Sequence, residues 1–434
     1  MFDRIIYHID VNSAFLSWEA VYRLHHKGGR VDLREQVSAV GGDVTMRHGI
    51  ILAKSIPAKQ YNIKTGESLA EAKQKCPDLI IMPPNYNLYE QCSAAFMGIL
   101  REYSDVVEQY SIDEAFVDMT STCHLFGTPE ETAHIIKNRI REELGFTVNI
   151  GISTNKLLAK MASDFKKPDR VHTLYPHEME RKMWPLAVSD LFFIGRATAK
   201  KLFTMGIRTI GELADSDPAW LRTILKKQGE VIWGFANGID VSPVLSTPPA
   251  NKGYGNSTTT PFDVVDADTA KTVLLSLAET LGNRLRKDDV RITVVAVGIR
   301  FTDLTYCSHQ KVIATPTNIT GEIHKAASEL FDELWNGRPI RHLGIHTSHV
   351  QENDLMRQLT IFDEIDYEKL MAVDRTVDTI RDRFGNDSVM RAVFAPKLGQ
   401  HHSQSSPARP ALDHMSGGIS REKREVDYSK IKIE

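Results

Sequence analysis

A chain of 434 residues is too long for one compact hydrophobic core, so we expect two to four domains. The net charge of −3 excludes a uniformly basic surface, so any surface that binds nucleic acid must be local. The four cysteines lack Cys-x-x-Cys spacing, which argues against a zinc site or disulfide framework and fits a reducing compartment. The sequence begins without signal-peptide features and has no run of 18 apolar residues, so we expect a cytoplasmic protein with no membrane contact.

Strand-like segments come first in the chain, and acidic residues stand at their ends. Residues 4–11 predict a strand that ends near Asp10, and residues 105–119 predict a hairpin with Asp113 and Glu114 at its junction. Side chains alternate between the two faces of a strand but can converge where strands end, so Asp10 could approach the pair. Three crowded carboxylates repel one another, and a divalent cation would offset that cost.

A helix with clear start and stop signals follows. Thr128 is the expected N-cap, Pro129 the first helical residue, and Glu131 completes a capping box; Gly145 ends the helix. The next segment, residues 146–153, predicts another strand. A hairpin, a helix and a strand beside an N-terminal strand indicate a split βαβ sheet with helices on one face.

Further segments predict helices, a linker and a second domain. Residues 155–165 predict a helix. Residues 191–214 contain two glycine turns between short helices, which is typical of a helix-hairpin-helix pair that contacts DNA phosphates through backbone amides. The Pro/Ser/Thr-rich stretch before Gly253 predicts a linker. Residues 254–350 alternate helical and strand-like patterns and predict an α+β domain, and the composition after Gln400 is typical of disorder.

Four motifs in this order carry a family resemblance: HIDVNSAFLSWE, YSIDEAFVD, GISTNKLLAKMASDFKKPD and FIGRATAKKLFTMGIRTIGELA. Together they resemble the Y family of lesion-bypass DNA polymerases, and the bacterial DNA polymerase IV branch is the nearest match. The likeness continues through GNSTTTPFDV, PIRHLGIHTSHV and RQLTIFDE and covers roughly residues 4 to 395. It implies an α+β multidomain, right-hand-like polymerase with a ferredoxin-like palm, small fingers, a helical helix-hairpin-helix thumb and a C-terminal α+β little finger.

The resemblance also implies the activity and the organisation of the chain. The expected enzyme is a template-directed, low-fidelity translesion DNA polymerase that adds deoxynucleoside triphosphates to a primer 3′-hydroxyl. It would act on primer–template DNA as a monomer and bind the bacterial sliding clamp. The expected domains are a palm (1–12 and 82–165), fingers (13–81), a thumb (166–240), a linker (241–252), a little finger (253–350) and a C-terminal tail (351–434).

Individual site residues are implied in the same way. The metal-binding carboxylates of the family fall on Asp10, Asp113 and Glu114, and the backbone carbonyl of Val11 would also face a metal ion. Two Mg²⁺ ions per active site are expected, because hard cations prefer carboxylate and phosphate oxygens and two such ions clamp the attacking and leaving oxygens. The aromatic steric gate that rejects the ribose 2′-hydroxyl falls on Phe15.

Other contacts follow from the resemblance, with departures from its pattern. Lys160 falls on the lysine that touches the incoming triphosphate. The segment SIPAK stands where the family carries SYEAR, so Lys59 offers the triphosphate a point charge instead of a bidentate fork, and Ile56 offers no hydroxyl. Asn12 stands where DNA polymerase IV has Asp. The expected DNA contacts are Gly195, Lys200, Lys201, Gly206, Arg291 and Arg300, and the expected clamp-binding peptide comprises Gln358, Leu359, Ile361 and Phe362.

Two other classes of function were weighed against the polymerase. A non-catalytic repair factor that keeps the fold would have no need of three crowded acids. A nucleotide cyclase on a related palm would leave the helix-hairpin-helix region without an obvious purpose. The pair Asp332-Glu333 is expected on the solvated face of a helix, which distinguishes it from Asp113-Glu114.

Overall fold

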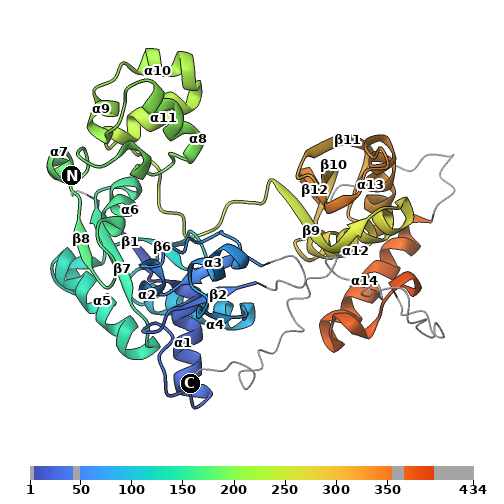
Figure 1. The fold of residues 1–434 in the computed structure, drawn as a ribbon, viewed down its shortest axis with the longest axis horizontal. Coiled ribbons are helices and arrows are strands. Elements are labelled where there is room, and N and C mark those ends of the chain that lie inside the picture. Colours follow the sequence, from blue (N-terminus) through green and yellow to red (C-terminus); the bar gives the residue numbers. More distant parts are fainter. Residues whose placement is uncertain (1–3, 43–48, 354–365, 395–434) are drawn as a thin grey trace. The chain divides into compact units, whose positions relative to one another are not determined.

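The computed structural model of the protein describes residues 4–42, 49–353 and 366–394 (Figure 1). The chain divides into two compact units: Met1–Gly41 and Ile51–Pro248 belong to the first, and the second continues from Pro249. Within the described ranges, no helix is both long enough and apolar enough to cross a membrane.

A five-stranded sheet forms the centre of the first unit (Figure 1). Its strand order is β5-β6-β1-β7-β8, with β7 and β8 parallel and the other neighbours antiparallel. The strands are β1 (Ile6–Val11), β5 (Val107–Gln109), β6 (Glu114–Asp118), β7 (Val148–Ser153) and β8 (Val171–Thr173). The strands predicted over residues 4–11, 105–119 and 146–153 are therefore confirmed. Strand β8 is an edge strand that the sequence patterns did not reveal.

Four helices surround this sheet, and the sequence predicted the last two of them but not the first two. They are α1 (Ala14–His26), α4 (Tyr86–Arg101), α5 (Pro129–Leu144) and α6 (Lys156–Asp164). The capping box of Thr128 and Glu131 is present at the start of α5, and Gly145 ends it with a φ of 74°. Asn155 caps α6, because its side chain accepts a hydrogen bond from the backbone N–H of Leu158.

Alternation along β1 sorts its side chains between two environments. Tyr7 and Ile9 lie in the core shared with α4 and α5, whereas Ile6 lies on the other face with Ala159 of α6. Asp10 has the same parity as Ile6 and therefore lies on the α6 face. The period of two thus delivers a carboxylate to the face that α6 covers.

The first unit also contains a small sheet and a helical region. The small sheet has the order β3-β2-β4, and its strands β2 (Ser38–Gly41), β3 (Ile51–Lys54) and β4 (Ile80–Met82) pack with α2 (Ile56–Lys59) and α3 (Leu69–Lys75). A separate apolar cluster holds the helices α7 (Met179–Lys182), α8 (Arg196–Thr204), α9 (Ile210–Ala214), α10 (Pro218–Leu225) and α11 (Lys227–Ala236). The turn between α8 and α9 contains Gly206 with a φ of 86°, as expected for a glycine turn.

The second unit is an antiparallel sheet covered by helices on one face. Its strands, in the order β11-β10-β12-β9, are β9 (Gly253–Val264), β10 (Val290–Phe301), β11 (Tyr306–Thr317) and β12 (Ile340–Glu352). The helices α12 (Ala267–Lys287) and α13 (Thr320–Leu334) share the apolar core with these strands. Asp332 pairs with Lys271 and its side chain is half exposed, as expected for a solvated helix face.

A third helix of the second unit, α14 (Tyr367–Phe384), was not predicted. Its buried residues are Asp374 and Arg381, which form ion pairs with Arg286 (3.1 Å) and Glu279 (3.3 Å) of α12. Its sequence, YEKLMAVDRTVDTIRDRF, nevertheless places apolar residues at helical spacing, so this pattern was available and was missed.

Candidate active site

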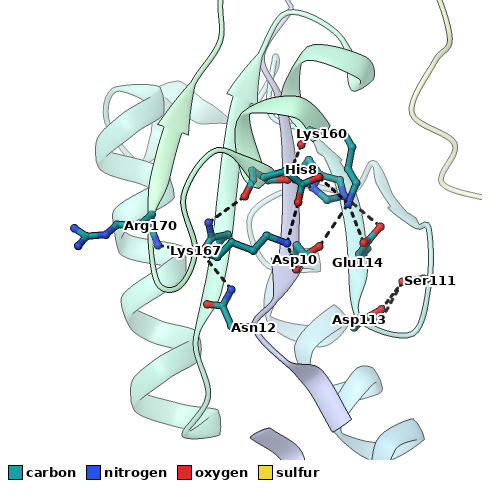
Figure 2. Close-up of polar contacts among 12 residues, drawn as sticks. His8, Asp10, Asn12, Ser111, Asp113, Glu114, Lys160, Lys167 and Arg170 are labelled. Carbon is teal, nitrogen blue, oxygen red and sulfur yellow. Dashed lines mark hydrogen bonds and ion pairs between the residues drawn. The ribbon is translucent and has the colours of Figure 1, made fainter. Parts of the chain in front are cut away.

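Two of the three predicted acids meet across neighbouring strands. Asp10 of β1 is the register partner of Glu114 of β6. Asp113 precedes β6, and its backbone carbonyl accepts a hydrogen bond from the N–H of Val11 (3.0 Å). The carboxylate of Asp113 accepts a hydrogen bond from Ser111 Oγ (2.6 Å), so its side chain lies beside the hairpin turn, apart from the other two (Figure 2).

Two lysines form ion pairs with the acids. Lys160 Nζ of α6 lies 2.8 Å from Glu114 Oε1 and 3.5 Å from Asp10 Oδ2. Lys167 Nζ, from the loop after α6, lies 2.9 Å from Asp10 Oδ1 (Figure 2). Asp164 contacts both ammonium groups, at 3.7 Å from Lys160 and 2.9 Å from Lys167. Three carboxylates thus share two positive charges, and the cluster keeps an excess of negative charge.

The pKa values of Asp10 and Glu114 are shifted in opposite directions. Burial raises the pKa of Asp10 to about 6, although Lys167 and Lys160 oppose the shift. Burial also raises the pKa of Glu114, but the contacts with His8 and Lys160 outweigh it and hold the pKa of Glu114 well below its usual range. Of the two acids, Asp10 therefore holds its proton more readily.

A neutral histidine, His8, lies beside Glu114 and contacts Ser163 of α6. Burial lowers the pKa of His8 to about 4, so its imidazole is uncharged at neutral pH. Its Nδ1 lies 2.7 Å from Ser163 Oγ, and its Nε2 lies 3.6 Å from Glu114 Oε2, beyond hydrogen-bond distance. The ring therefore ties β1 to α6 without adding charge to the site.

A cavity of about 140 Å³ opens beside Asp10. Lys59 and Ile56 of α2 line it, as does Lys167 from the loop after α6. Lys59 is exposed, so its ammonium is free to move toward a bound anion. The cavity joins the acidic cluster to a region of positive charge, which suits a polyanionic substrate.

The structure places Lys160 in the acidic cluster and adds residues that the sequence did not suggest. Lys160 contacts Glu114 more closely than it contacts Asp164, so it belongs to the cluster and is not only a surface partner of Asp164. Lys167 and Ser111 were missed. The available signal was sequence spacing. Lys160 is four residues before Asp164 and Lys167 is three residues after it, so both lysines can reach the Asp164 carboxylate.

Phe15 lies at the start of α1 within a stack of aromatic rings. Its ring is parallel to that of Tyr89, with centroids 4.5 Å apart, and Tyr86 meets it edge-on at 6.4 Å. Tyr89 is fully buried and its hydroxyl donates to Glu19 Oε1 (2.9 Å). The position of Phe15 is therefore set by packing and not by a polar contact.

The remaining predicted contacts lie on other elements. Gly195, Lys200, Lys201 and Gly206 are exposed on or next to α8. Arg300 is exposed and Arg291 half-buried on β10, in the second unit. The peptide of residues 358–362 lies outside the described residues.

The carboxylates fit a hard divalent cation in chemistry. Asp10 and Glu114 supply oxygen ligands from adjacent strands, and both already lie against cationic groups. Among the described residues, no three His, Cys, Asp or Glu side chains converge as metal ligands, and the carboxylate of Asp113 is hydrogen-bonded to Ser111. The fit therefore rests on the pair and on its burial.

Comparisons with known proteins show the family of the chain. Residues 9–164 match the impB/mucB/samB family, and residues 251–361 match the impB/mucB/samB family C-terminal domain. DNA polymerase IV of Clostridium acetobutylicum is 43% identical over 394 residues, which are 91% of this chain and 99% of that protein. DNA polymerase IV of Acetivibrio thermocellus is 37% identical over 401 residues, which are 91% and 98%. The solved structure of a Y-family DNA polymerase chimera has a TM-score of 0.69 at 24% identity, covering 80% of this chain and all of that one, and it shows the same fold.

Proposed function

Because the chain belongs to the Y family of DNA polymerases, and is a translesion-type DNA-directed DNA polymerase of the DNA polymerase IV branch, we propose that Asp10, Asp113 and Glu114 form its catalytic centre. The enzyme adds deoxynucleoside triphosphates to a primer 3′-hydroxyl, copying a template at low fidelity and past damaged bases. The observation that carries the assignment is the register of Asp10 with Glu114 at one end of the palm sheet, beside a cavity lined by lysines.

A divalent cation is the cofactor of this family, and we propose that two Mg²⁺ ions bind at Asp10, Glu114 and Asp113, with the backbone carbonyl of Val11 as a further oxygen ligand. Bound there, the ions supply Lewis acidity for the 3′-hydroxyl and for the phosphate oxygens. The protein would hold two of the carboxylates still through the pairing of β1 with β6, and the Asp113 carboxylate would turn from Ser111 to join them.

The lysines are proposed to serve the triphosphate. Lys160 and Lys167 stand over the carboxylates, and Lys59 lines the far side of the cavity. Positive charge placed where negative charge develops on the departing pyrophosphate lowers the barrier to its release. Lys59 replaces a bidentate guanidinium with a single charge, so it is suited to attract the phosphates and less suited to orient them.

The DNA and partner contacts are proposed from the family. The backbone amides around Gly195 and Gly206, together with Lys200 and Lys201, would hold DNA phosphates without reading sequence. On β10, Arg291 and Arg300 would add phosphate contacts. The assignment is tested by measuring how alanine variants of these basic residues bind primer–template at several salt concentrations. We propose a monomer as the working form, since the acids and lysines of the centre come from one chain.

Primer extension with Mg²⁺ tests the catalytic assignment. We expect wild type to extend a primer and Asp10→Ala, Asp113→Ala and Glu114→Ala to lose at least about 100-fold in rate, the scale seen when one charge-stabilising group is removed. The matched control is Asp332→Ala, which removes the acid of a similar doublet from the exposed face of α13. Equal rates for wild type and Asp113→Ala, or an inactive wild type, would contradict the assignment.

A further inference from the structure

The loop that carries Lys167 is fastened to the palm sheet by a buried amide. Asn149 of β7 is fully buried, and its Nδ2 donates to the backbone carbonyls of Ser163 (3.0 Å) and Lys166 (2.8 Å). Its Oδ1 accepts from the backbone N–H of Arg170 (3.3 Å). One side chain on a rigid strand thus holds both ends of the loop, residues 166–170, through main-chain groups.

A second amide completes the attachment. Asn12, just beyond the end of β1, is 8% exposed and donates its Nδ2 to Asn149 Oδ1 (3.2 Å). Its Oδ1 accepts from the backbone N–H of Asp169 (2.9 Å) and from Thr147 Oγ1 (3.0 Å). Figure 2 shows Asn12 below Lys167 at this end of the sheet.

The orientation of both amides follows from their partners. Backbone carbonyls can only accept and backbone N–H groups can only donate, so the contacts of Asn149 with Lys166 and Arg170 assign its oxygen and nitrogen. The orientation of Asn149 then requires that Asn12 donate to it. Asn149 uses all four of its hydrogen-bonding positions, and rotation of either amide would break bonds to the loop.

The loop presents Lys167 to two places at once. Lys167 Nζ lies 2.9 Å from Asp10 Oδ1, and the same residue lines the cavity beside Asp10. Asp169, in the same loop, is tied on the outer side to Lys137 (2.8 Å) and Arg141 (3.3 Å) of α5. These outer ion pairs hold the loop against α5, but the amides determine its height above the sheet.

We propose that Asn12 and Asn149 are positioning residues that set the place of the Lys167 ammonium and thereby determine how tightly the incoming nucleotide is bound. The inference rests on the proposed function, because it assigns Lys167 to the triphosphate. Neither asparagine touches the reacting atoms. Each acts through the loop, and a shift of about 1 Å in a group that positions substrate can cost on the order of 100-fold in rate.

This arrangement explains why an asparagine is suited to position 12. An aspartate there would keep the acceptor for Asp169 but would lose the donor to Asn149 Oδ1, and two oxygens would face each other in a buried setting. It would also add a negative charge two residues from Asp10, within a cluster that already has excess negative charge. The amide avoids both costs.

The test separates binding from catalysis. Affinity for dTTP is measured by equilibrium titration of the full chain on a primer–template whose primer ends in a dideoxynucleotide, and KM and kcat are measured in parallel on an extendable primer. We expect Asn149→Ala and Asn12→Ala to weaken dTTP binding and raise KM by roughly tenfold, the effect of losing or displacing one charge-assisted hydrogen bond. Because neither residue touches the reacting atoms, kcat should change less than KM.

A double-mutant cycle with Lys167→Ala decides the route of the effect. If Asn149 acts by placing Lys167, then Asn149→Ala should have little further effect on dTTP affinity once Lys167 is alanine. The proposal would be overturned if the losses of dTTP affinity in the two single variants multiplied in the double variant. It would also be overturned if either asparagine variant or Lys167→Ala bound dTTP with wild-type affinity. Asn12→Ala is the milder change, since all three backbone contacts of Asn149 remain.

A matched control accounts for stability. Thr128→Ala removes the capping box of α5, which destabilises the helix, and touches neither the loop nor the cavity. It should lower the unfolding temperature yet leave dTTP affinity unchanged. Failure of wild type to bind dTTP or to extend a primer would count against the proposed function, whereas wild-type binding with unaffected asparagine variants would count against the positioning role alone.

Discussion

At the scale of single residues, packing fixes the position of Phe15, the proposed steric gate. Its ring is stacked on Tyr89, and Tyr89 is held by burial and by its hydrogen bond to Glu19. An aromatic ring in such a stack has little freedom to withdraw, so it can exclude an atom that would fit beside a mobile side chain. It lies at the start of α1, five residues after Asp10.

We predict that Phe15→Ala will admit ribonucleotides. The change opens space where the sugar is expected, and incorporation of ribonucleotides relative to deoxyribonucleotides should rise by at least about tenfold, as for removal of a steric contact in a specificity pocket. Competition between ATP and dATP in single-nucleotide extension measures the ratio. Phe15→Tyr, which keeps the ring, should retain discrimination; an unchanged ratio in Phe15→Ala would remove the residue from the gate role.

At the scale of elements, the close approach of α6 to β7 brings the lysines to the acids. A Cβ at Gly151 would collide with the backbone oxygen of Ala159 and the backbone nitrogen of Ser163. Only glycine leaves room for the helix at this distance. Lys160 on α6 therefore reaches Glu114, and the loop after α6 reaches Asp10, because β7 lacks a side chain here.

We predict that Gly151→Ala will destabilise the first unit. Overpacking between backbone atoms that cannot yield should cost about 1–3 kcal/mol of unfolding free energy, measured by chemical denaturation. The matched control is Gly98→Ala in α4, where an added Cβ meets nothing within 4 Å. That substitution should instead stabilise by roughly 0.5–1 kcal/mol, since glycine is costly inside a helix. Equal effects of the two substitutions would contradict the close-packing argument.

At the scale of the whole molecule, the two units have separate hydrophobic cores. The chain that leaves the first unit is anchored at its start: Val244 is buried with Ile6 and Phe116, and the N–H of Leu245 donates to Glu108 Oε2 (2.8 Å). Residues 245–253 are then exposed. The predicted linker over 241–252 thus begins with residues that pack on the first unit.

The clamp-binding peptide is a prediction at this scale, because it concerns how the enzyme reaches its substrate. The peptide lies in sequence between β12 and α14, outside the described residues. We expect simultaneous replacement of Gln358, Leu359 and Phe362 by alanine to abolish stimulation by the bacterial sliding clamp, since tethering acts by raising effective concentration. Extension without the clamp should be unaffected. Loss of both activities would indicate a folding defect, and full stimulation would refute the docking role.

Local patterns predicted many of the elements and the acids of the proposed site. The capping box at Thr128 and the glycine at 145 determine the limits of α5, since caps act within one turn of the helix. The acids were found because they interrupt strand-like runs, and the ordered motifs identified the polymerase fold, which the structural comparison confirms. These features depend on residues near one another in the sequence, or on a family pattern.

Long-range contacts remained for the tertiary structure to decide. Lys167 meets Asp10 only because β1 and β7 are neighbours and Gly151 admits α6, and no local pattern contains that information. For the same reason, the amide pair of Asn12 and Asn149 could not be found in the sequence, where 137 positions separate the two residues. The buried ion pairs that attach α14 to α12 are likewise long-range contacts. The sequence by itself thus determined which elements form and which acids they carry, whereas only the packing of those elements decided which charges and amides meet.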